Sequence, residues 1–242
     1  NGSWSVYSFD DSDKEKTRIN IPSVFEGEGD LVFEKQFDIA ESNFQKNNFE
    51  LHFFGINHTA DISINNKLIY KHSGGDYPFS LQLPKDLLRI DKKNLLSVRV
   101  ISKLNPESTI PVKQRFLFPK SFGGIFRDVF IKVMPNVHLT SVQYNSDFSN
   151  GVSNPKLKVN LSIENNEFLQ SRDSIFGTGT QFEVKISISS DTSNNPISSF
   201  SEVSEIKKGK EKKINAVLSV GNPKLWSPDR PASYKLKIQI FK

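Results

Sequence analysis

Apolar and polar residues alternate with a period of two along most of this chain. The clearest run places Leu157, Val159, Leu161 and Ile163 on one side, with polar residues between them. Because successive side chains of a strand point to opposite faces, this pattern predicts a β-strand with one buried and one solvated face. Similar runs predict strands at residues 31–39, 48–56, 60–71, 78–84, 94–103, 128–134, 182–188 and 234–240.

Helical periodicity is nearly absent, and only residues 84–88 fit a single helical turn. The pair Asn65-Asn66 lies between two apolar runs. Asparagine tolerates the positive φ that a tight turn needs, so we expect a hairpin there. Many short strands separated by turns indicate a sandwich or a barrel. The sequence therefore predicts an all-β fold.

Two domains are expected, with their boundary beside Pro135. The strand that ends at Val133 stops near this proline, which cannot continue a central hydrogen-bonded ladder. A new alternating segment begins at Val137. We therefore place one domain at residues 1–135 and a second at residues 136–242, and both have an ordinary domain size.

Composition supports strands and excludes several classes of protein. Phenylalanine occurs 20 times and methionine once, and aromatic side chains fit pleated surfaces. No cysteine is present, so the chain has no disulfide and no thiol nucleophile. Four scattered histidines argue against zinc, and the acidic residues 10–13 lack the spacing of a calcium loop. We expect no metal, no cofactor and, without a run of 18 apolar residues, no membrane partner.

The formal net charge is +5, and the densest basic stretch is residues 207–213. Such a stretch can bind a polyanion. It can equally form a hairpin turn around Gly209, with lysines that discourage edge-to-edge association. We favour the turn, because no aromatic residue interleaves the run as single-stranded nucleic acid would require. No nucleic acid partner is expected.

Four segments interrupt the alternation with glycine, proline and aromatic residues. They are residues 21–37, which begin Ile-Pro-Ser; residues 54–79, which begin Phe-Gly-Ile and include Gly-Gly-Asp-Tyr-Pro-Phe; residues 122–129, Phe-Gly-Gly-Ile-Phe-Arg-Asp-Val; and residues 223–234, which include Leu-Trp-Ser-Pro. In this order and spacing they resemble the N-terminal part of family-two glycoside hydrolases, which include β-galactosidases and β-glucuronidases.

The resemblance implies a jelly-roll domain followed by an immunoglobulin-like sandwich, neither of them catalytic. In the family, both glutamates of the retaining mechanism lie on a third domain, a C-terminal barrel. This sequence has no strand–helix alternation to build that barrel, so we expect no hydrolysis by residues 1–242 alone. Family members add one more strand after the segment at 234–240. We therefore expect the second sandwich to lack its last strand and the barrel of the same polypeptide to be its partner.

Carbohydrate contacts are expected where aromatic and polar side chains share a loop. Tyr77 with Asp76, and Arg115 with Lys120, are the candidates, and the second pair would suit a carboxylated sugar. β-Galactosidases carry an Asp and a Trp in the region that residues 114–120 occupy here, so the resemblance does not imply galactose specificity. We interpret the paired glycines as structural and Trp226 as a plug at one end of the second sandwich.

Three functions stay open at this point. The first is the accessory region of a retaining glycosidase, which would shape the active-site cleft and assist homo-oligomerisation. The second is a free-standing carbohydrate-binding module, and the third is an adhesive surface protein, since sandwich folds host many functions. The first residues lack a signal-like pattern, so a leader either has been removed or never existed. We expect a periplasmic or extracellular location.

Overall fold

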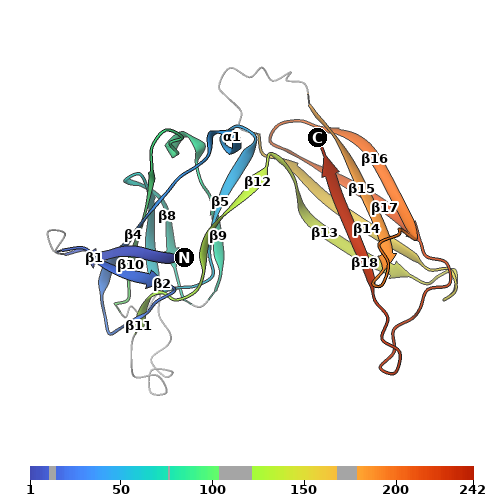
Figure 1. The fold of residues 1–242 in the computed structure, drawn as a ribbon, viewed down its shortest axis with the longest axis horizontal. Helices are drawn as coiled ribbons and strands as arrows, with labels where there is room; N and C mark the ends of the chain where they lie inside the picture. Colours follow the sequence, from blue (N-terminus) through green and yellow to red (C-terminus); the bar gives the residue numbers. More distant parts are fainter. Residues whose placement is uncertain (11–14, 76, 104–121, 168–178) are drawn as a thin grey trace. The chain divides into compact units, whose positions relative to one another are not determined.

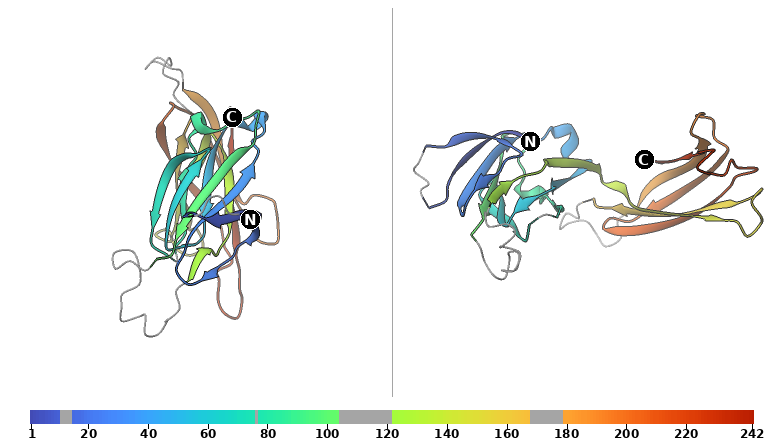
Figure 2. Two further views of the ribbon diagram at one scale, coloured as in Figure 1. Left: turned by 90° about the vertical axis from the view of Figure 1, so that its left-hand side faces the viewer. Right: turned by 90° about the horizontal axis from the view of Figure 1, so that it is seen from below.

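The computed structural model describes residues 1–10, 15–75, 77–103, 122–167 and 179–242 of the chain. It divides into two compact units, Asn1–Met134 and Pro135–Lys242 (Figure 1). Figure 2 shows the strands of each unit stacked in layers. Nearly every described element is a strand, which confirms the all-β prediction.

The first unit is built on a six-stranded sheet in the order β2-β1-β4-β10-β7-β8. Its strands are β1 (Gly2–Ser8), β2 (Thr17–Ile21), β4 (Asp30–Phe37), β7 (Thr59–Ile64), β8 (Lys67–Ser73) and β10 (Asn94–Ile101). Two three-stranded sheets, β12-β5-β9 and β3-β11-β6, complete the unit. Their strands are β3 (Phe25–Glu26), β5 (Asn47–Phe53), β6 (Ile56–Asn57), β9 (Phe79–Gln82), β11 (Phe122–Ile125) and β12 (Val129–Pro135).

One hydrophobic core joins these sheets. Phe33 of β4, Phe53 of β5, Ile62 of β7 and Val98 of β10 are all buried within it. Burying a side chain of this size stabilises the fold by about 1.5–3 kcal/mol relative to leaving it exposed. Two short helical elements, α1 (Glu41–Phe44) and η1 (Lys85–Leu87), join strands at the surface, and η1 confirms the predicted turn.

The turn at Asn65-Asn66 has the predicted form. Both residues have positive φ, 50° and 69°, and they join the antiparallel pair β7 and β8. The side chain of Asn65 fixes the turn: its Oδ1 accepts from the Leu95 N–H at 2.9 Å, and its Nδ2 donates to the Leu87 carbonyl at 2.7 Å. The hairpin is therefore stabilised by hydrogen bonds to residues outside it as well as by its own backbone.

The second unit is a sandwich of two three-stranded sheets, β13-β14-β17 and β16-β15-β18. Its strands are β13 (Val137–Asp147), β14 (Lys156–Asn165), β15 (Thr180–Ser190), β16 (Ser198–Ile206), β17 (Lys210–Ser219) and β18 (Tyr234–Phe241). The centre of its core is made by β14 and β15, from which Val159, Ile163, Val184 and Ile186 are fully buried.

The predicted hairpin around Gly209 is wrong. β16 and β17 belong to different sheets, so residues 207–209 carry the chain across the sandwich instead of between paired neighbours. Ile206 of β16 and Ile214 of β17 are both buried in the shared core, one from each sheet. Gly209 takes a φ of +66° at the crossing, and its N–H donates to the Asn165 carbonyl at 2.7 Å.

Candidate functional site

Three of the glycine-containing segments meet in the sheet β3-β11-β6. In its registers Gly123 lies opposite Phe25, and Gly124 lies opposite Asn57. A Cβ on Gly123 would come within 2.4 Å of the Phe25 ring, and Gly124 has a φ of +129°. Both positions therefore require glycine for close backbone approach and for backbone conformation, as the sequence indicates.

Tyr77 is the predicted contact residue that the structure describes, whereas Asp76, Arg115 and Lys120 lie outside the described residues. The Tyr77 side chain is 49% exposed, but its hydroxyl donates to the Ser73 carbonyl at 2.7 Å. Its ring leans on His72, which is buried and stacks on Phe79 with 3.8 Å between ring centroids. Tyr77 therefore exposes part of its ring to solvent, while its hydroxyl proton is already used in the hydrogen bond to Ser73.

His72 is the buried titratable group beneath this loop. Burial lowers its pKa, although a hydrogen bond with the Gly74 backbone acts in the opposite direction. Its Nε2 has no hydrogen-bond partner among the described residues. Since a charged imidazole would be costly there, the ring is neutral at neutral pH and serves the packing of the loop.

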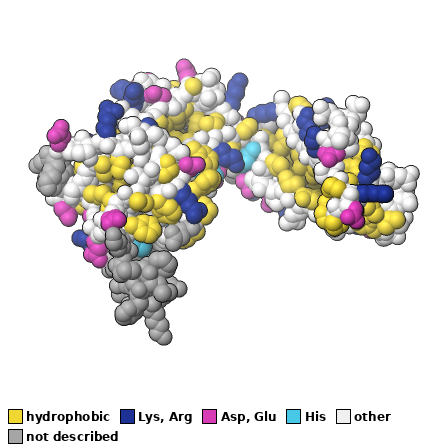
Figure 3. All heavy atoms as spheres, turned by 60° about the horizontal axis from the view of Figure 1, so that its bottom comes forward, with side chains coloured by type: hydrophobic (Ala, Val, Ile, Leu, Met, Phe, Trp, Pro, Cys, Tyr) yellow, Lys and Arg dark blue, Asp and Glu magenta, His cyan; other side chains and the backbone are white. Residues whose placement is uncertain are grey.

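Aromatic rings that are exposed or half-buried form a second feature, which we call the aromatic strip: His52, Phe54, Phe122, Phe126 and Phe130. His52 and Phe130 stack at 4.9 Å, Phe54 meets Phe130 edge-on at 5.4 Å, and Phe122 meets Phe126 edge-on at 6.2 Å. The two groups adjoin at Gly55, where a Cβ would lie 2.5 Å from the Phe126 ring. Hydrophobic side chains reach the surface over parts of both units in Figure 3.

The flanks of the aromatic strip carry charged side chains of both signs. The Arg127 guanidinium lies 5.6 Å from the centroid of the Phe126 ring. Glu50 lies 2.8 Å from His52 Nε2 and accepts from the Ser80 hydroxyl at 2.9 Å. Burial opposes ionisation of Glu50, but hydrogen bonds from Ser80 and His52 outweigh it and hold its pKa below the ordinary value. Glu50 therefore acts as a fixed carboxylate at the edge of the strip.

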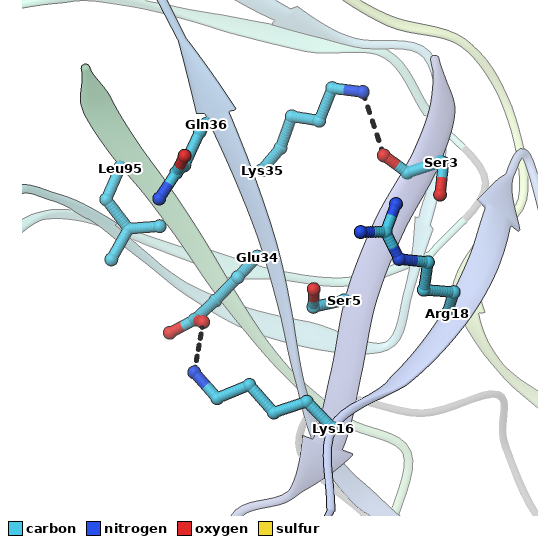
Figure 4. Close-up of a pocket in the computed structure, with 8 residues that line it drawn as sticks. All are labelled: Ser3, Ser5, Lys16, Arg18, Glu34, Lys35, Gln36 and Leu95. Carbon is cyan, nitrogen blue, oxygen red and sulfur yellow. Dashed lines mark hydrogen bonds and ion pairs between the residues drawn. The ribbon is translucent and has the colours of Figure 1, made fainter.

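A third feature is a hollow on the outer face of the six-stranded sheet, which we call the polar hollow (Figure 4). Its volume is about 400 Å³. Its walls come from β1, β4 and β10 and from residues in and next to β2, and they are Ser3, Ser5, Lys16, Arg18, Glu34, Lys35, Gln36 and Leu95. Three cations and one carboxylate thus face a space that is open to solvent.

The second unit contains an apolar groove of about 210 Å³. Phe148, Leu157, Ile188 and Tyr234 line it, and the segment that carries Trp226 closes one side. Trp226 is 67% exposed, so the prediction that it plugs the sandwich is wrong. Hydrogen bonds hold the segment that carries Trp226 outside the core. The Lys224 N–H donates to the Tyr234 hydroxyl at 2.7 Å, and Ser227 pairs with Arg230.

Two searches cover the part of the chain that the structure describes. There, no three histidine, aspartate or glutamate side chains lie together in a way that could hold a metal ion. Across the same residues, no helix has the length and apolar character needed to cross a bilayer.

Comparison with known families decides the relationship. Residues 7–135 match the family described as "Glycosyl hydrolases family 2, sugar binding domain", and residues 137–242 match "Glycosyl hydrolases family 2". The chain belongs to glycosyl hydrolase family 2. The resemblance drawn from the four sequence segments is confirmed, and both parts of the family 2 architecture occur in the expected order.

Curated relatives are considerably longer than this family 2 chain. A β-galactosidase of Thermoanaerobacter pseudethanolicus is 22% identical over 210 residues, which cover 86% of this chain and 26% of that protein. A putative β-glucuronidase of Formosa agariphila is 25% identical over 205 residues, covering 84% and 22%. The chain therefore spans about a quarter of the length of these relatives.

Solved family 2 structures share the fold. A putative β-galactosidase from Bacteroides fragilis superimposes with a TM-score of 0.76 at 18% identity, covering 100% of this chain and 38% of that one. A Bacteroides uniformis β-glucuronidase superimposes with a TM-score of 0.74 at 19% identity, covering 99% and 29%. At this level of identity the likeness establishes the architecture of the chain.

Proposed function

We propose that this chain is the non-catalytic N-terminal region of a retaining family 2 glycosidase of the β-galactosidase or β-glucuronidase type. One observation carries the proposal: the two family 2 matches cover nearly the whole chain in order, while the chain spans about a quarter of its relatives. The catalytic carboxylate pair would then lie on a barrel supplied by the rest of the polypeptide.

The aromatic strip supports a docking role for the first unit. Phe54 and Phe130 are each 41% exposed although they are large and apolar. Exposed apolar clusters of this kind mark interaction surfaces, and interface cores are enriched in aromatic residues and arginine. Arg127 lies beside Phe126, so the strip combines aromatic residues with an arginine, as interface cores do. The strip would pack against the barrel and so support one wall of the active-site cleft.

The second unit also presents a surface that suits further polypeptide. β18 pairs with β15 alone among the described strands, so its outer edge is open. Its inward residues Leu236, Ile238 and Ile240 are only half-buried. Across the sandwich, Tyr144 of β13 is 70% exposed although its register partner Val159 is buried. We infer that a further strand pairs with the open edge of β18 and covers these apolar side chains.

The proposal is tested by comparing residues 1–242 with the protein encoded by the complete gene. Nitrophenyl galactosides and glucuronides are the substrates, and released nitrophenol is measured. We expect the full-length protein to hydrolyse one of them and residues 1–242 to hydrolyse neither. Turnover by residues 1–242 alone, or an inactive full-length protein, would contradict the proposal. A reading frame that closes at residue 242 would instead favour a free-standing carbohydrate-binding module.

We also propose that the full-length protein is periplasmic or extracellular and that it forms homo-oligomers. A periplasmic or extracellular location is read from cell fractionation, with the full-length protein detected by antibody. Homo-oligomerisation is read from light scattering of the full-length protein after gel filtration. A cytoplasmic monomer would remove both predictions while leaving the hydrolase proposal in place.

A further inference from the structure

The polar hollow owes its shape to small residues between long ones. Ser5 of β1 lies opposite Arg18 on one side and opposite Glu34 on the other. Because register partners in a sheet point to the same face, a serine floor lies between two long side chains. Gln36 and Leu95, themselves register partners, bound the far side. A volume of about 400 Å³ falls within the range of small-molecule sites, about 300–1,000 Å³.

The single carboxylate in the hollow is already neutralised. Lys16 Nζ lies 2.7 Å from Glu34 Oε2. The hydroxyls of Tyr7 and Ser97 donate to Oε1 at 3.0 and 3.4 Å. Burial, followed by the bond to Glu34, raises the pKa of Tyr7, so its hydroxyl stays protonated as a donor. Glu34 is thus a fixed, charge-balanced group.

The remaining charge is positive and concentrated at the other end. Lys35 Nζ donates to the Ser3 carbonyl at 2.8 Å, which holds the ammonium beside the serine floor. In Figure 4 the Arg18 guanidinium reaches toward the same part of the hollow. Among the described residues, no carboxylate lies within ion-pair distance of Arg18 or Lys35. A planar guanidinium with a neighbouring ammonium is a good receptor for a carboxylate, which Arg binds with two parallel hydrogen bonds.

These two ends select a particular kind of ligand. A compact dianion would contact Arg18 and Lys35 but would leave Ser5, Gln36 and Leu95 without a contact. A ligand with one anionic end and a neutral, hydroxyl-bearing body contacts both kinds of group. The Ser5 hydroxyl, the Gln36 amide and the Glu34 carboxylate offer both donors and acceptors to hydroxyl groups. Leu95 offers an apolar surface to the C–H groups of a sugar ring.

We propose that the polar hollow is a binding site for a carboxylated saccharide, a uronic acid residue either free or within an oligosaccharide. Arg18 and Lys35 bind the carboxylate, and Ser5, Gln36 and Glu34 bind sugar hydroxyls. The site goes beyond the proposed accessory role, because binding there requires neither the barrel nor hydrolysis. It would hold the protein on acidic glycans.

The test is a titration of residues 1–242 followed by amide NMR or calorimetry, with glucuronate, galacturonate, a uronide trisaccharide, glucose, galactose and sodium sulfate as separate ligands. We expect the uronates to bind about tenfold or more tightly than the neutral sugars, because charge-assisted hydrogen bonds are stronger than those between neutral groups. Higher salt should weaken binding. Tighter binding of the trisaccharide would identify polymeric glycan as the source, and equal binding would identify the free sugar.

Variants separate the hollow from other basic surfaces. Arg18→Ala should lower uronate affinity about tenfold or more, and Arg18→Lys should lower it less, because charge remains but the planar fork is lost. Lys71→Ala is the matched control: Lys71 is a lysine of the same sheet, 3.7 Å from Asp61 and outside the hollow, and should leave affinity unchanged. Circular dichroism checks that each variant folds.

Several outcomes would overturn the proposal. Glucose that binds as well as glucuronate would remove the role of the carboxylate. Sulfate that binds as tightly as uronates and displaces them would reduce the hollow to a general anion site. Absent binding, or binding that survives Arg18→Ala, would place any saccharide site elsewhere. None of these results depends on whether the full-length protein is a hydrolase, so failure here and failure of the proposed function are separate.

Discussion

A central strand of the first unit and an edge strand of the second share the period-two alternation but bury their apolar residues to different extents. In the first unit β10 has a partner strand on each side, and Leu96, Val98 and Val100 are all buried. In the second unit β18 lies at a sheet edge, and its inward residues Ile238 and Ile240 stay half-buried. Alternation therefore predicts which face of a strand is apolar, whereas the opposing sheet decides whether that face is covered.

Truncation in the closed core of the first unit should have the largest effect. Phe53→Ala removes a side chain with no exposed surface and should lower the free energy of unfolding by about 3–5 kcal/mol. The neighbouring Phe54→Ala is the matched control and should cost under about 1 kcal/mol, because Phe54 is 41% exposed. Urea denaturation measures both. Equal losses would mean that residues 47–54 do not bury alternate faces as described.

The second unit allows the same comparison between a covered and an open position. Ile186 of β15 and Ile238 of β18 are register partners, so they differ mainly in burial. Ile186→Ala should destabilise by about 2–5 kcal/mol and Ile238→Ala by less than half as much. In the full-length protein the Ile238→Ala loss should grow if a further strand covers β18. A loss that stays the same would argue against that strand.

Acid should weaken the first unit through His72. Burial lowers the pKa of His72 below its ordinary value of 6.5, so the unfolded chain takes up a proton first as pH falls. The contribution of His72 to the free energy of unfolding should therefore be constant above about pH 6.5 and should decrease below it, by at most about 1.4 kcal/mol per pH unit for one proton. Urea denaturation at pH 7.5, 6.5 and 5.5 measures this dependence.

Two variants identify the histidine responsible. His72→Phe should flatten the dependence between pH 6.5 and 5.5, since a phenylalanine ring preserves the stacking on Phe79 without titrating. His138→Phe, in the second unit, should leave the unfolding of the first unit unchanged. A His72→Phe variant with the original slope would show that another group is responsible.

The smallest effect is expected at Tyr144. Because this side chain is 70% exposed on β13, Tyr144→Ser should change the stability of residues 1–242 by no more than about 0.5 kcal/mol. Thermal unfolding of this chain measures the change. A loss above 1 kcal/mol would mean that Tyr144 is already covered, and the proposed open side of the sandwich would be wrong.

Much of the fold was predictable from local patterns. The strand alternation, the short helical turn near residue 85 and the Asn65-Asn66 hairpin all depend on neighbours in sequence, and the structure confirms them. β1 and β2 were missed because each contributes few inward apolar residues, such as Trp4 and Ile21, and so shows little alternation. Missing them also concealed the polar hollow, whose floor and cationic wall they supply.

The candidate surfaces were harder to predict because they combine residues from distant parts of the chain. His52 and Phe130 stack across neighbouring strands, although 77 residues lie between them in the sequence. Trp226 was misplaced for a related reason. A large aromatic residue between two prolines suggests a core plug, but hydrogen bonds at Lys224 and Ser227 hold its segment outside the core, and nothing in the local pattern signals that.

The sequence by itself determined the all-β class, the main strands and membership in glycosyl hydrolase family 2, because side-chain alternation, turn residues and motif order are local properties of the chain. Only the tertiary structure decided which apolar faces are covered, how β16 and β17 are divided between sheets, and where Arg18, Lys35 and Glu34 come together. Those features depend on strand pairing across long separations. Pairing is set by the total burial of the two cores, which no single segment specifies.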